Sequence, residues 1–193
     1  MNKKITVYCS SSDALEDSYY KAAHDMGALM VKNGYDLVFG GSNVGMMGAI
    51  ARAVHSHGGK VTGVIPEFMH NRGIAYEASN ELIVTTDLRE RKKIMENRAD
   101  AFIAMPGGFG TLEEILEVLT LKQLRSHTKP VILLNINGFF DPLAAFFELL
   151  YDGRFAKEDH RNMYFVAESC ESVFEFLGSY TPALATSKWT EIN

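Results

Sequence analysis

Cysteine is scarce in this sequence, and so are long apolar runs. Cys9 and Cys170 are its two cysteines, and they form neither a C-x-x-C motif nor the framework of a disulfide-rich protein. Reduced thiols in a cytoplasmic protein are therefore expected. The apolar run near the N-terminus, from Ile5 to Cys9, is too short for a signal peptide or a membrane-spanning helix.

Positive charge is also in deficit. Nineteen lysines and arginines against 24 aspartates and glutamates give a net charge of −5, which predicts no global attraction to nucleic acid or to an anionic membrane. The six histidines are scattered without metal-ligand spacing, so no metal site is predicted. An anionic ligand would have to be attracted locally, by a few cations and backbone dipoles.

What the chain does contain is an alternation of short apolar segments and amphipathic ones. Its 193 residues, 47% hydrophobic and 22% charged, have the size and composition of one globular domain. Strands are expected at residues 5–10, 35–39, 60–65, 81–85, 101–105, 129–136 and 163–167. Helices are expected at 15–33, from the 40–48 loop to about 57, and at 87–98, 111–119, 139–152 and 173–180.

This alternation predicts an α/β fold, a doubly wound parallel sheet with helices on both faces, as a single domain over residues 1–193. Asp13 is placed to cap the first helix. Residues 67–80 have no clear period and are expected to form a loop or lid. The tail from about residue 181 is expected to be loosely attached.

The most informative stretch is residues 101–119. A short apolar run ends at Pro106, glycines follow at 107, 108 and 110, and Thr111 opens a segment with apolar residues at i, i+3, i+4 and i+7. This order predicts a strand, a glycine loop and a helix with one buried face. Such a loop lets backbone N–H groups approach a ligand, and the helix N-terminus favours an anion. A phosphate is expected to bind here.

A second glycine loop spans residues 40–48, GGSNVGMMG. A dinucleotide fingerprint would need glycine in place of Ser42, and a Walker loop would need Lys and then Ser or Thr in place of Met46 and Met47. The other loop has Glu113 where a dinucleotide fingerprint has its third glycine. Two glycine loops at neighbouring strand ends still favour a nucleotide or sugar-phosphate site, since parallel sheets bind ligands at the carboxyl ends of their strands.

Glu114 has two interpretations. Thr111 followed by Glu114 three residues later forms a capping box, in which both residues do no more than cap a helix. The alternative is a catalytic carboxylate. At about 100° per residue, Glu114 lies nearly opposite the apolar face of its helix, so it would face solvent unless a second wall, such as another subunit, encloses it.

The charged helix expected at residues 87–98 places cations on its apolar seam. Arg91 and Lys92 lie three and four residues after Leu88 and so share its face, whereas Arg89 belongs to the solvated face. A cation on a packed face needs an anionic partner. Either these two form structural ion pairs or extend their stems over apolar surface, or both reach the same phosphate or carboxylate.

Residues 106–114, PGGFGTLEE, match the P-G-G-x-G-T-x-x-E signature of the Lonely guy (LOG) proteins, and the sequence resembles this family. The resemblance covers most of the chain up to about residue 165. Further matching segments are VYCSSS at 7–12, the glycine loop at 40–48, ERK at 90–92 and KPVILLN at 129–135.

The resemblance implies a Rossmann-like fold without a dinucleotide, and a homodimer with its sites near the subunit interface. It implies a cytokinin riboside 5′-monophosphate phosphoribohydrolase, which hydrolyses the N-glycosidic bond of an N6-substituted adenosine 5′-monophosphate to the free base and ribose 5-phosphate. Arg91 and Glu114 would be catalytic, and no metal or redox cofactor is needed. The substrate, a purine nucleoside 5′-monophosphate, would be bound by Ser10, Gly41, Ser42, Arg91, Lys92, Gly107, Gly108, Gly110, Thr111 and Glu113.

Other hypotheses stay open. Ser42 replaces a loop glycine of the family, Leu88-Arg89 replaces its usual Met-His, and Gly73 lies near the position of an acidic residue that plant members carry, so plain AMP is also a candidate substrate. A non-catalytic nucleotide-binding or carrier protein on the same fold would use Glu114 only as a helix cap. A pyridoxal-phosphate decarboxylase is a distant third hypothesis, because residues 126–129, SHTK, have the residue types of that lysine motif in the wrong order.

Overall fold

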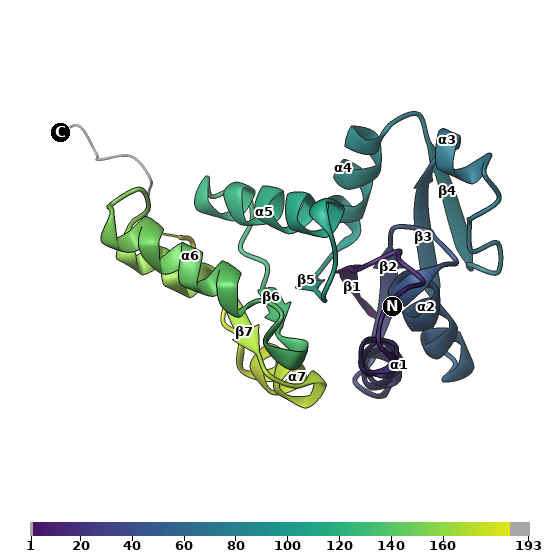
Figure 1. The fold of residues 1–193 in the computed structure, drawn as a ribbon, viewed down its shortest axis with the longest axis horizontal. Coiled ribbons are helices and arrows are strands. Elements are labelled where there is room, and N and C mark those ends of the chain that lie inside the picture. The colour runs from purple at the N-terminus through teal and green to yellow at the C-terminus, as the bar shows by residue number, and fades with distance from the viewer. Residues whose placement is uncertain (1, 186–193) are drawn as a thin grey trace.

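The computed structural model describes residues 2–185. Within these residues, seven strands form one parallel sheet in the order β4-β3-β2-β1-β5-β6-β7 (Figure 1). The strands are β1 (Lys3–Tyr8), β2 (Tyr35–Phe39), β3 (Val61–Pro66), β4 (Glu81–Thr85), β5 (Ala101–Ala104), β6 (Val131–Leu134) and β7 (Phe165–Ala167). The predicted doubly wound parallel fold is confirmed.

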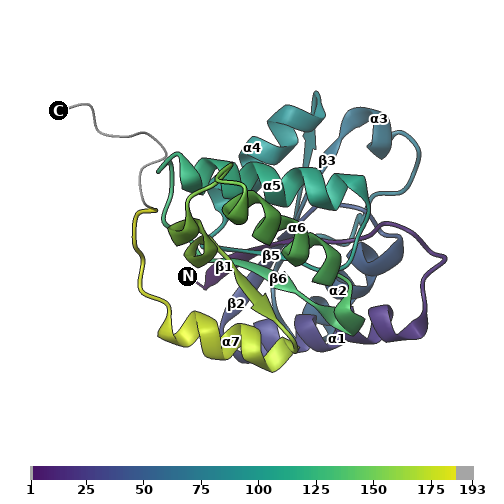
Figure 2. The same ribbon diagram turned by 60° about the vertical axis from the view of Figure 1, so that its left-hand side comes forward.

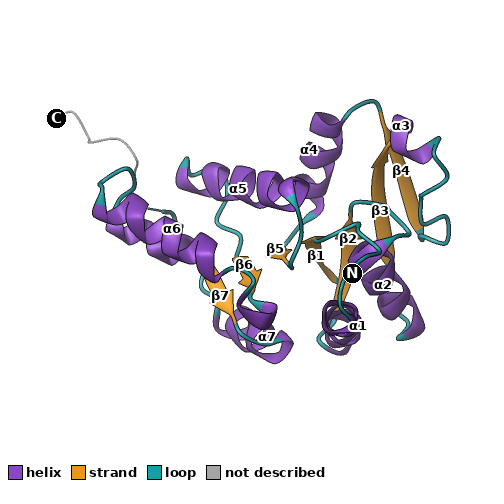
Figure 3. Ribbon diagram, viewed as in Figure 1, coloured by secondary structure: helices purple, strands orange, loops and turns teal. Residues whose placement is uncertain are grey.

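Helices cover both faces of this sheet, with α1, α2 and α7 on one face and α4, α5 and α6 on the other (Figures 1 and 2). The α-helices are α1 (Asp17–Lys32), α2 (Gly45–Ser56), α3 (Glu67–His70), α4 (Leu88–Arg98), α5 (Phe109–Gln123), α6 (Asp141–Asp152) and α7 (Cys170–Ser179). Two 3₁₀ turns are η1 (Ile136–Gly138) and η2 (Glu158–Met163). Figure 3 shows the strands lying between the two helical layers.

Each helical layer has its own hydrophobic core. Strand β1 supplies both cores, because Val7 packs on the side of α1 and α2 while Tyr8 packs on the side of α4 and α5. Its residues from Ile5 to Tyr8 are all buried. Strands covered on both faces have continuous apolar runs rather than alternating ones, which is why short apolar segments marked the strands so well in the sequence.

The order of the strands reverses at β1. Strands β2 to β4 extend the sheet to one side of β1, and β5 to β7 extend it to the other. Since Tyr8 pairs with Ala104 in the register, β1 and β5 end side by side, and the N–H of Ser10 donates to the carbonyl of Pro106 at 3.1 Å. Open parallel sheets bind ligands at such a switch point.

Three local expectations differ from the structure. The glycine loops do not follow neighbouring strands, because β1 lies between β2 and β5. Residues 67–80 are not wholly irregular: they begin with α3 and return to the 40–48 loop through a bridge between Ser42 and Ala75. Asp13 does not cap the first helix, since Glu16 is the N-cap of α1. The bridge between Ser42 and Ala75 and the bond from the N–H of Gly45 to Asp13 Oδ1 are both long-range contacts, which local patterns do not reveal.

The remaining expectations concern the chain end, the cysteines and membranes. The tail from about residue 181 is expected to be loosely attached, and most of it, residues 186–193, lies outside the described part. Just before it, the carbonyl of Ala185 accepts a hydrogen bond from Arg125 Nε at 3.0 Å. Cys9 and Cys170 are both buried free thiols. Of the helices in residues 2–185, none is long and apolar enough to cross a membrane.

Candidate active site

A cavity of about 440 Å³ opens at the switch point between β1 and β5. Its walls come from the ends of β1 and β5 and from the first turns of α2, α4 and α5, with α3 at its rim. The lining residues are Cys9, Ser10, Ser11, Ser12, Met47, Met69, Leu88, Arg91, Gly108, Phe109, Gly110, Thr111 and Glu114. Thus both predicted catalytic residues line one cavity together with most of the predicted phosphate loop.

The loop before α5 needs its first glycine. A Cβ at Gly107 would lie 2.1 Å from Thr111 Oγ1 and 3.0 Å from the backbone nitrogen of Ser10, so a side chain there would push the loop off β1. Gly108 is the N-cap of α5, and as a glycine it has no side chain with which to cap the helix. The first N–H groups of α5 are therefore left for solvent or a ligand, and the helix dipole favours an anion beside them.

The predicted capping box is absent. Helix α5 begins at Phe109, so Thr111 and Glu114 both lie inside the helix, beyond its N-cap position. The carboxylate of Glu114 instead pairs with the guanidinium of Arg91. The interpretation of Glu114 as a helix cap is therefore wrong for this structure, because two glycines before Thr111 already allow the helix to start.

The side chain of Arg91 is fixed by hydrogen bonds and close packing. Asp87 caps α4 and sets the start of that helix, with its Oδ1 accepting from the N–H groups of Arg89 and Glu90 at 2.8 Å each. One turn further on, Arg91 Nε donates to the carbonyl of Val64 at 2.9 Å. Its Nη2 lies over Gly40, where a Cβ would be only 2.0 Å away. One role of the 40–48 glycine loop is thus to leave room for this guanidinium.

Glu114 is 4% exposed within a single chain. The expectation that it would face solvent without a second subunit is wrong, because α4 packs against the side of α5 that the apolar pattern left unassigned. Burial raises the pKa of the Glu114 carboxyl, although the positive charge of Arg91 and its hydrogen bond oppose the rise. A buried carboxyl beside a fixed cation at a cavity wall is suited to charge stabilisation or proton transfer.

Lys92 reaches different carboxylates from those of Arg91. Its Nζ pairs with Glu113 and, at 2.5 Å, with Glu117 Oε2. Within the described residues the two cations therefore do not share a carboxylate, and both form ion pairs, as the first of the two interpretations predicts. Lys92 and Glu113 lie beside the Arg91–Glu114 pair, at the contact of α4 with α5, and neither belongs to the cavity lining.

The N-terminus of α2 is already occupied. Asp13 Oδ1 accepts from the N–H of Gly45 at 2.7 Å, and the carbonyl of Ser10 accepts from that of Met47 at 3.3 Å. Gly41 and Ser42 are buried just behind the cavity and outside its lining. Of the residues predicted in this part of the site, Ser10 is the one that lines the cavity.

Sequence reasoning missed the apolar part of the lining. Met47, Met69, Leu88 and Phe109 line the cavity, and Phe109 is 94% exposed. A large apolar residue at the first position of a helix, directly after a glycine loop, was the available signal. Asp13 was also missed as a partner of the second glycine loop, because its contact with Gly45 spans 32 residues.

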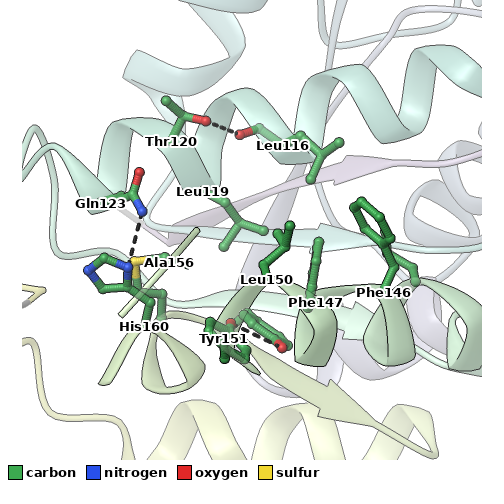
Figure 4. Close-up of a pocket in the computed structure, with 13 residues that line it drawn as sticks. Leu116, Leu119, Thr120, Gln123, Phe146, Phe147, Leu150, Tyr151, Ala156 and His160 are labelled. Carbon is green, nitrogen blue, oxygen red and sulfur yellow. Dashed lines mark hydrogen bonds between the residues drawn. The ribbon is translucent and has the colours of Figure 1, made fainter. Parts of the chain in front are cut away.

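A second cavity, of about 370 Å³, lies between α5 and α6 (Figure 4). Its wall is mainly leucine and aromatic side chains, among them Leu116, Leu119, Phe146, Phe147 and Leu150. Gln123 and His160 meet at one end, where Gln123 Nε2 lies 3.1 Å from His160 Nδ1. With no carboxylate or cation pair in its lining, this cavity does not have the chemistry of the first.

The SHTK segment lies away from the candidate site. Lys129 Nζ donates to the carbonyl of Glu96 at 2.8 Å and lies over the ring of Phe102. His127 contacts the carbonyl of Val118 through Nε2 at 3.0 Å. These side chains are used in packing between α4, α5 and β5, so the segment lends no support to a pyridoxal-phosphate site.

Comparisons with known proteins show which family this chain resembles. The family model described as possible lysine decarboxylase matches residues 47–177. The chain is 42% identical over 180 residues to the cytokinin riboside 5′-monophosphate phosphoribohydrolase LOG of Oryza sativa subsp. japonica, which covers 93% of this chain and 74% of that protein. It is 41% identical over 195 residues to LOG7 of Arabidopsis thaliana, with coverage of 99% and 90%.

Solved structures share the fold. The molybdenum cofactor binding protein of Rippkaea orientalis superposes with a TM-score of 0.72 at 27% identity, covering 93% of this chain and 97% of that one. The molybdenum cofactor carrier protein of Chlamydomonas reinhardtii superposes with a TM-score of 0.71 at 23% identity, covering 92% and 97%. At that identity the second likeness concerns the fold alone.

Proposed function

The chain belongs to the Lonely guy (LOG) family, whose model is described as possible lysine decarboxylase and whose curated members are named cytokinin riboside 5′-monophosphate phosphoribohydrolases. From that premise we propose that it is an N-glycosyl hydrolase acting on a purine nucleoside 5′-monophosphate. The products are the free base and ribose 5-phosphate. This agrees with the function that the signature at residues 106–114 predicts.

One observation carries the proposal: a buried Arg91–Glu114 pair shares a cavity with an uncapped helix N-terminus. The first N–H groups of α5 would hold the 5′-phosphate, with Ser10 and Thr111 beside them. This fixes the sugar relative to Glu114, one turn along the same helix. Holding the reacting groups in place contributes part of the rate, because the entropy of positioning is lost on binding and not in the chemical step.

The reaction breaks the bond between the anomeric carbon and a base nitrogen, with water supplying the new C–O bond. Positive charge develops on the ribose as that bond breaks, as in glycoside hydrolysis. The carboxylate of Glu114 would stabilise that charge and accept one proton of the attacking water. The departing base takes the electron pair of the broken C–N bond and a proton from solvent, which gives the neutral free base. The positive charge of Arg91 opposes the rise in the pKa of Glu114 that burial causes, and its own fixed position keeps the carboxylate aimed at the cavity.

Incubation with AMP and with isopentenyl-AMP tests the proposal, with free base and ribose 5-phosphate measured by chromatography. Base release from either nucleotide supports hydrolysis, and the ratio of the two kcat/KM values gives the preference for the N6 substituent. Arg91→Ala and Glu114→Gln should slow release by roughly 10² to 10⁴-fold while nucleotide still binds. Release at the wild-type rate in Glu114→Gln would remove this carboxylate from the mechanism.

A second candidate is a nucleotide-binding or carrier protein. The named cofactor-binding role of the Rippkaea orientalis protein, which shares this fold at 27% identity, favours it. In a carrier, Glu114 would hold Arg91 and do no chemistry. Tight nucleotide binding by calorimetry without base release from either nucleotide would establish the carrier and exclude the hydrolase.

We further propose that the protein is a homodimer. Burial of Glu114 within one chain removes the need for a partner wall at the carboxylate. Support comes instead from apolar side chains left on the surface near α6, with Phe146 54%, Leu149 63% and Phe155 82% exposed, since exposed apolar patches often mark protein–protein contacts. Light scattering after size-exclusion chromatography should give twice the chain mass, and Leu149→Glu should shift it toward the monomer.

A further inference from the structure

The contact between α4 and α5 is crowded with carboxylates. Glu113, Glu114 and Glu117 come from α5, and Glu96 comes from α4. Arg91 and Lys92 form ion pairs with the three acids of α5, while Lys92 and Lys129 lie near Glu96. Such an excess of negative charge at a packed contact is unfavourable unless each cation is well placed.

Lys92 is placed to balance this contact. Its side chain is 12% exposed, and its ammonium joins Glu113 and Glu117, which lie four residues apart on one face of α5. Burial alone would lower the pKa of Lys92, but its hydrogen bonds to the two carboxylates raise the pKa above its ordinary value, so the side chain stays charged at neutral pH. Lys92 follows Arg91 directly, yet it is Arg91 that lines the cavity.

We propose that Lys92 is a positioning residue for hydrolysis: by pairing with Glu113 and Glu117 it fastens α5 to α4 and keeps the Arg91 guanidinium for Glu114 alone. The inference rests on the proposed function for its kinetic consequences. It gives Lys92 a role through other residues, in place of a direct contact with the nucleotide.

Without Lys92, the charges around Glu114 would rearrange. Glu114 is faced by Arg91 from α4 and by its neighbour Glu113 on α5. From the end of β1, the hydroxyl of Tyr8 and the thiol of Cys9 also face it, as neutral groups with raised pKa values. Glu113 and Glu117 would lose their shared cation and would compete with Glu114 for Arg91. Glu114 would lose both its fixed geometry and part of the positive potential that favours its ionised form, since Lys92 lowers its pKa.

The test compares Lys92→Met with Lys93→Met, which removes the same charge one residue later on the solvent-exposed side of α4. For Lys92→Met we expect kcat to fall about tenfold with KM changed less than about threefold, and the acidic limb of the pH profile of kcat/KM to move up by about 0.5 to 1 pH unit. Lys93→Met should match the wild type in all three quantities.

Two rescue variants separate positioning from mere folding. Lys92→Arg keeps the charge and should recover most of kcat and the wild-type acidic limb. Lys92→Met combined with Glu113→Gln and Glu117→Gln removes the competing carboxylates together with their cation, and should restore the limb even where stability stays low. A pH limb that stays shifted in the triple variant would overturn the proposal.

Other outcomes also decide. A rise in KM with kcat unchanged in Lys92→Met would overturn the proposal by showing that Lys92 contacts the nucleotide. Equal behaviour of Lys92→Met and Lys93→Met would also overturn it, by showing that Lys92 neither contacts the nucleotide nor positions Arg91 and Glu114. If the wild type releases no base, the proposed function fails on its own. The inference is then judged by the Glu114 carboxyl, whose pKa, followed by ¹³C NMR titration, should be higher in Lys92→Met than in Lys93→Met.

Discussion

The two glycine loops lie at the same edge of the sheet and have similar compositions, but the helices that follow them begin in different surroundings. At α2 the N–H of Gly45 is bonded to the carboxylate of Asp13. At α5 the N-cap is Gly108, which has no side chain to bond the first turn. One helix N-terminus is thus filled by an anion of the chain itself, and the other is left for an anion from outside.

The glycines of the two loops are needed for different reasons as well. At positions 40 and 48 they admit neighbouring groups, since a Cβ would lie 2.0 Å from Arg91 Nη2 and 1.9 Å from the carbonyl of Asn43 respectively. At Gly108 and Gly110 a Cβ would meet nothing within 4 Å. Glycine richness therefore has two meanings in this fold: close packing at Gly40, Gly48 and Gly107, and open space beside the backbone at Gly108 and Gly110.

Among the tests of this comparison, Glu114→Gln should have the largest effect. It leaves the glycine loop before α5 unchanged and removes only the negative charge of the carboxylate beside it. We expect kcat to fall by roughly 10² to 10⁴-fold, with nucleotide affinity changed by less than about tenfold. Steady-state kinetics and calorimetry measure the two effects. Equal losses in kcat and in affinity would mean that Glu114 serves binding and not chemistry.

Gly108→Asp tests the comparison by making α5 resemble α2. The backbone at Gly108 has φ −88° and ψ −156°, which any residue adopts, so the new carboxylate can cap the helix. We expect KM for the nucleotide to rise about tenfold or more, because the carboxylate competes with the phosphate for the same N–H groups and repels it. Gly108→Ala is the matched control and should leave KM within about threefold of the wild type.

Asp13→Ala opens the N-terminus of α2 instead. The loss of one charged cap should lower the free energy of unfolding by about 1 kcal/mol, measured by chemical denaturation. Asp13→Asn keeps an acceptor for Gly45 and should lose less. A large rise in KM with unchanged stability would place the phosphate at α2 and reverse the assignment of the two loops.

The smallest expected effect is on the pH dependence of stability. Burial raises the folded-state pKa of Glu114 above its ordinary value of 4.5. The unfolded chain then binds fewer protons than the folded one between these two pKa values, so this group makes the free energy of unfolding fall as pH rises through that window. The difference in stability between the wild type and Glu114→Gln, followed from pH 4 upward, should show this slope. A slope of the opposite sign would mean that Arg91 outweighs burial.

Much of the fold followed from local patterns. Strands covered on both faces are continuous apolar runs, and each expected strand is present within a few residues. The prediction of which side of α4 is packed was correct for two residues: Arg91 is buried and Arg89 is exposed. A single helix has one packed face, and the apolar pattern gives its position whatever lies against it.

The same phase argument failed for Glu114. It treated α5 as a helix with one buried face, toward the sheet, whereas α4 covers a second side of it. That packing pairs residues 23 positions apart, and a one-dimensional period carries no information about such a neighbour. The capping box failed for a related reason, since the glycines let α5 begin two residues earlier than Thr111.

By itself, the sequence determined the order of strands and helices, the two glycine loops and the residue types of the site, because these depend on neighbours along the chain. Tertiary structure alone decided which helix N-terminus is open, which cation meets which carboxylate, and that one chain encloses Glu114. Those outcomes depend on Asp13, Gly40 and Val64 arriving from distant segments at the switch point of the sheet. Burial and charge balance are properties of that assembly, and no single segment contains them.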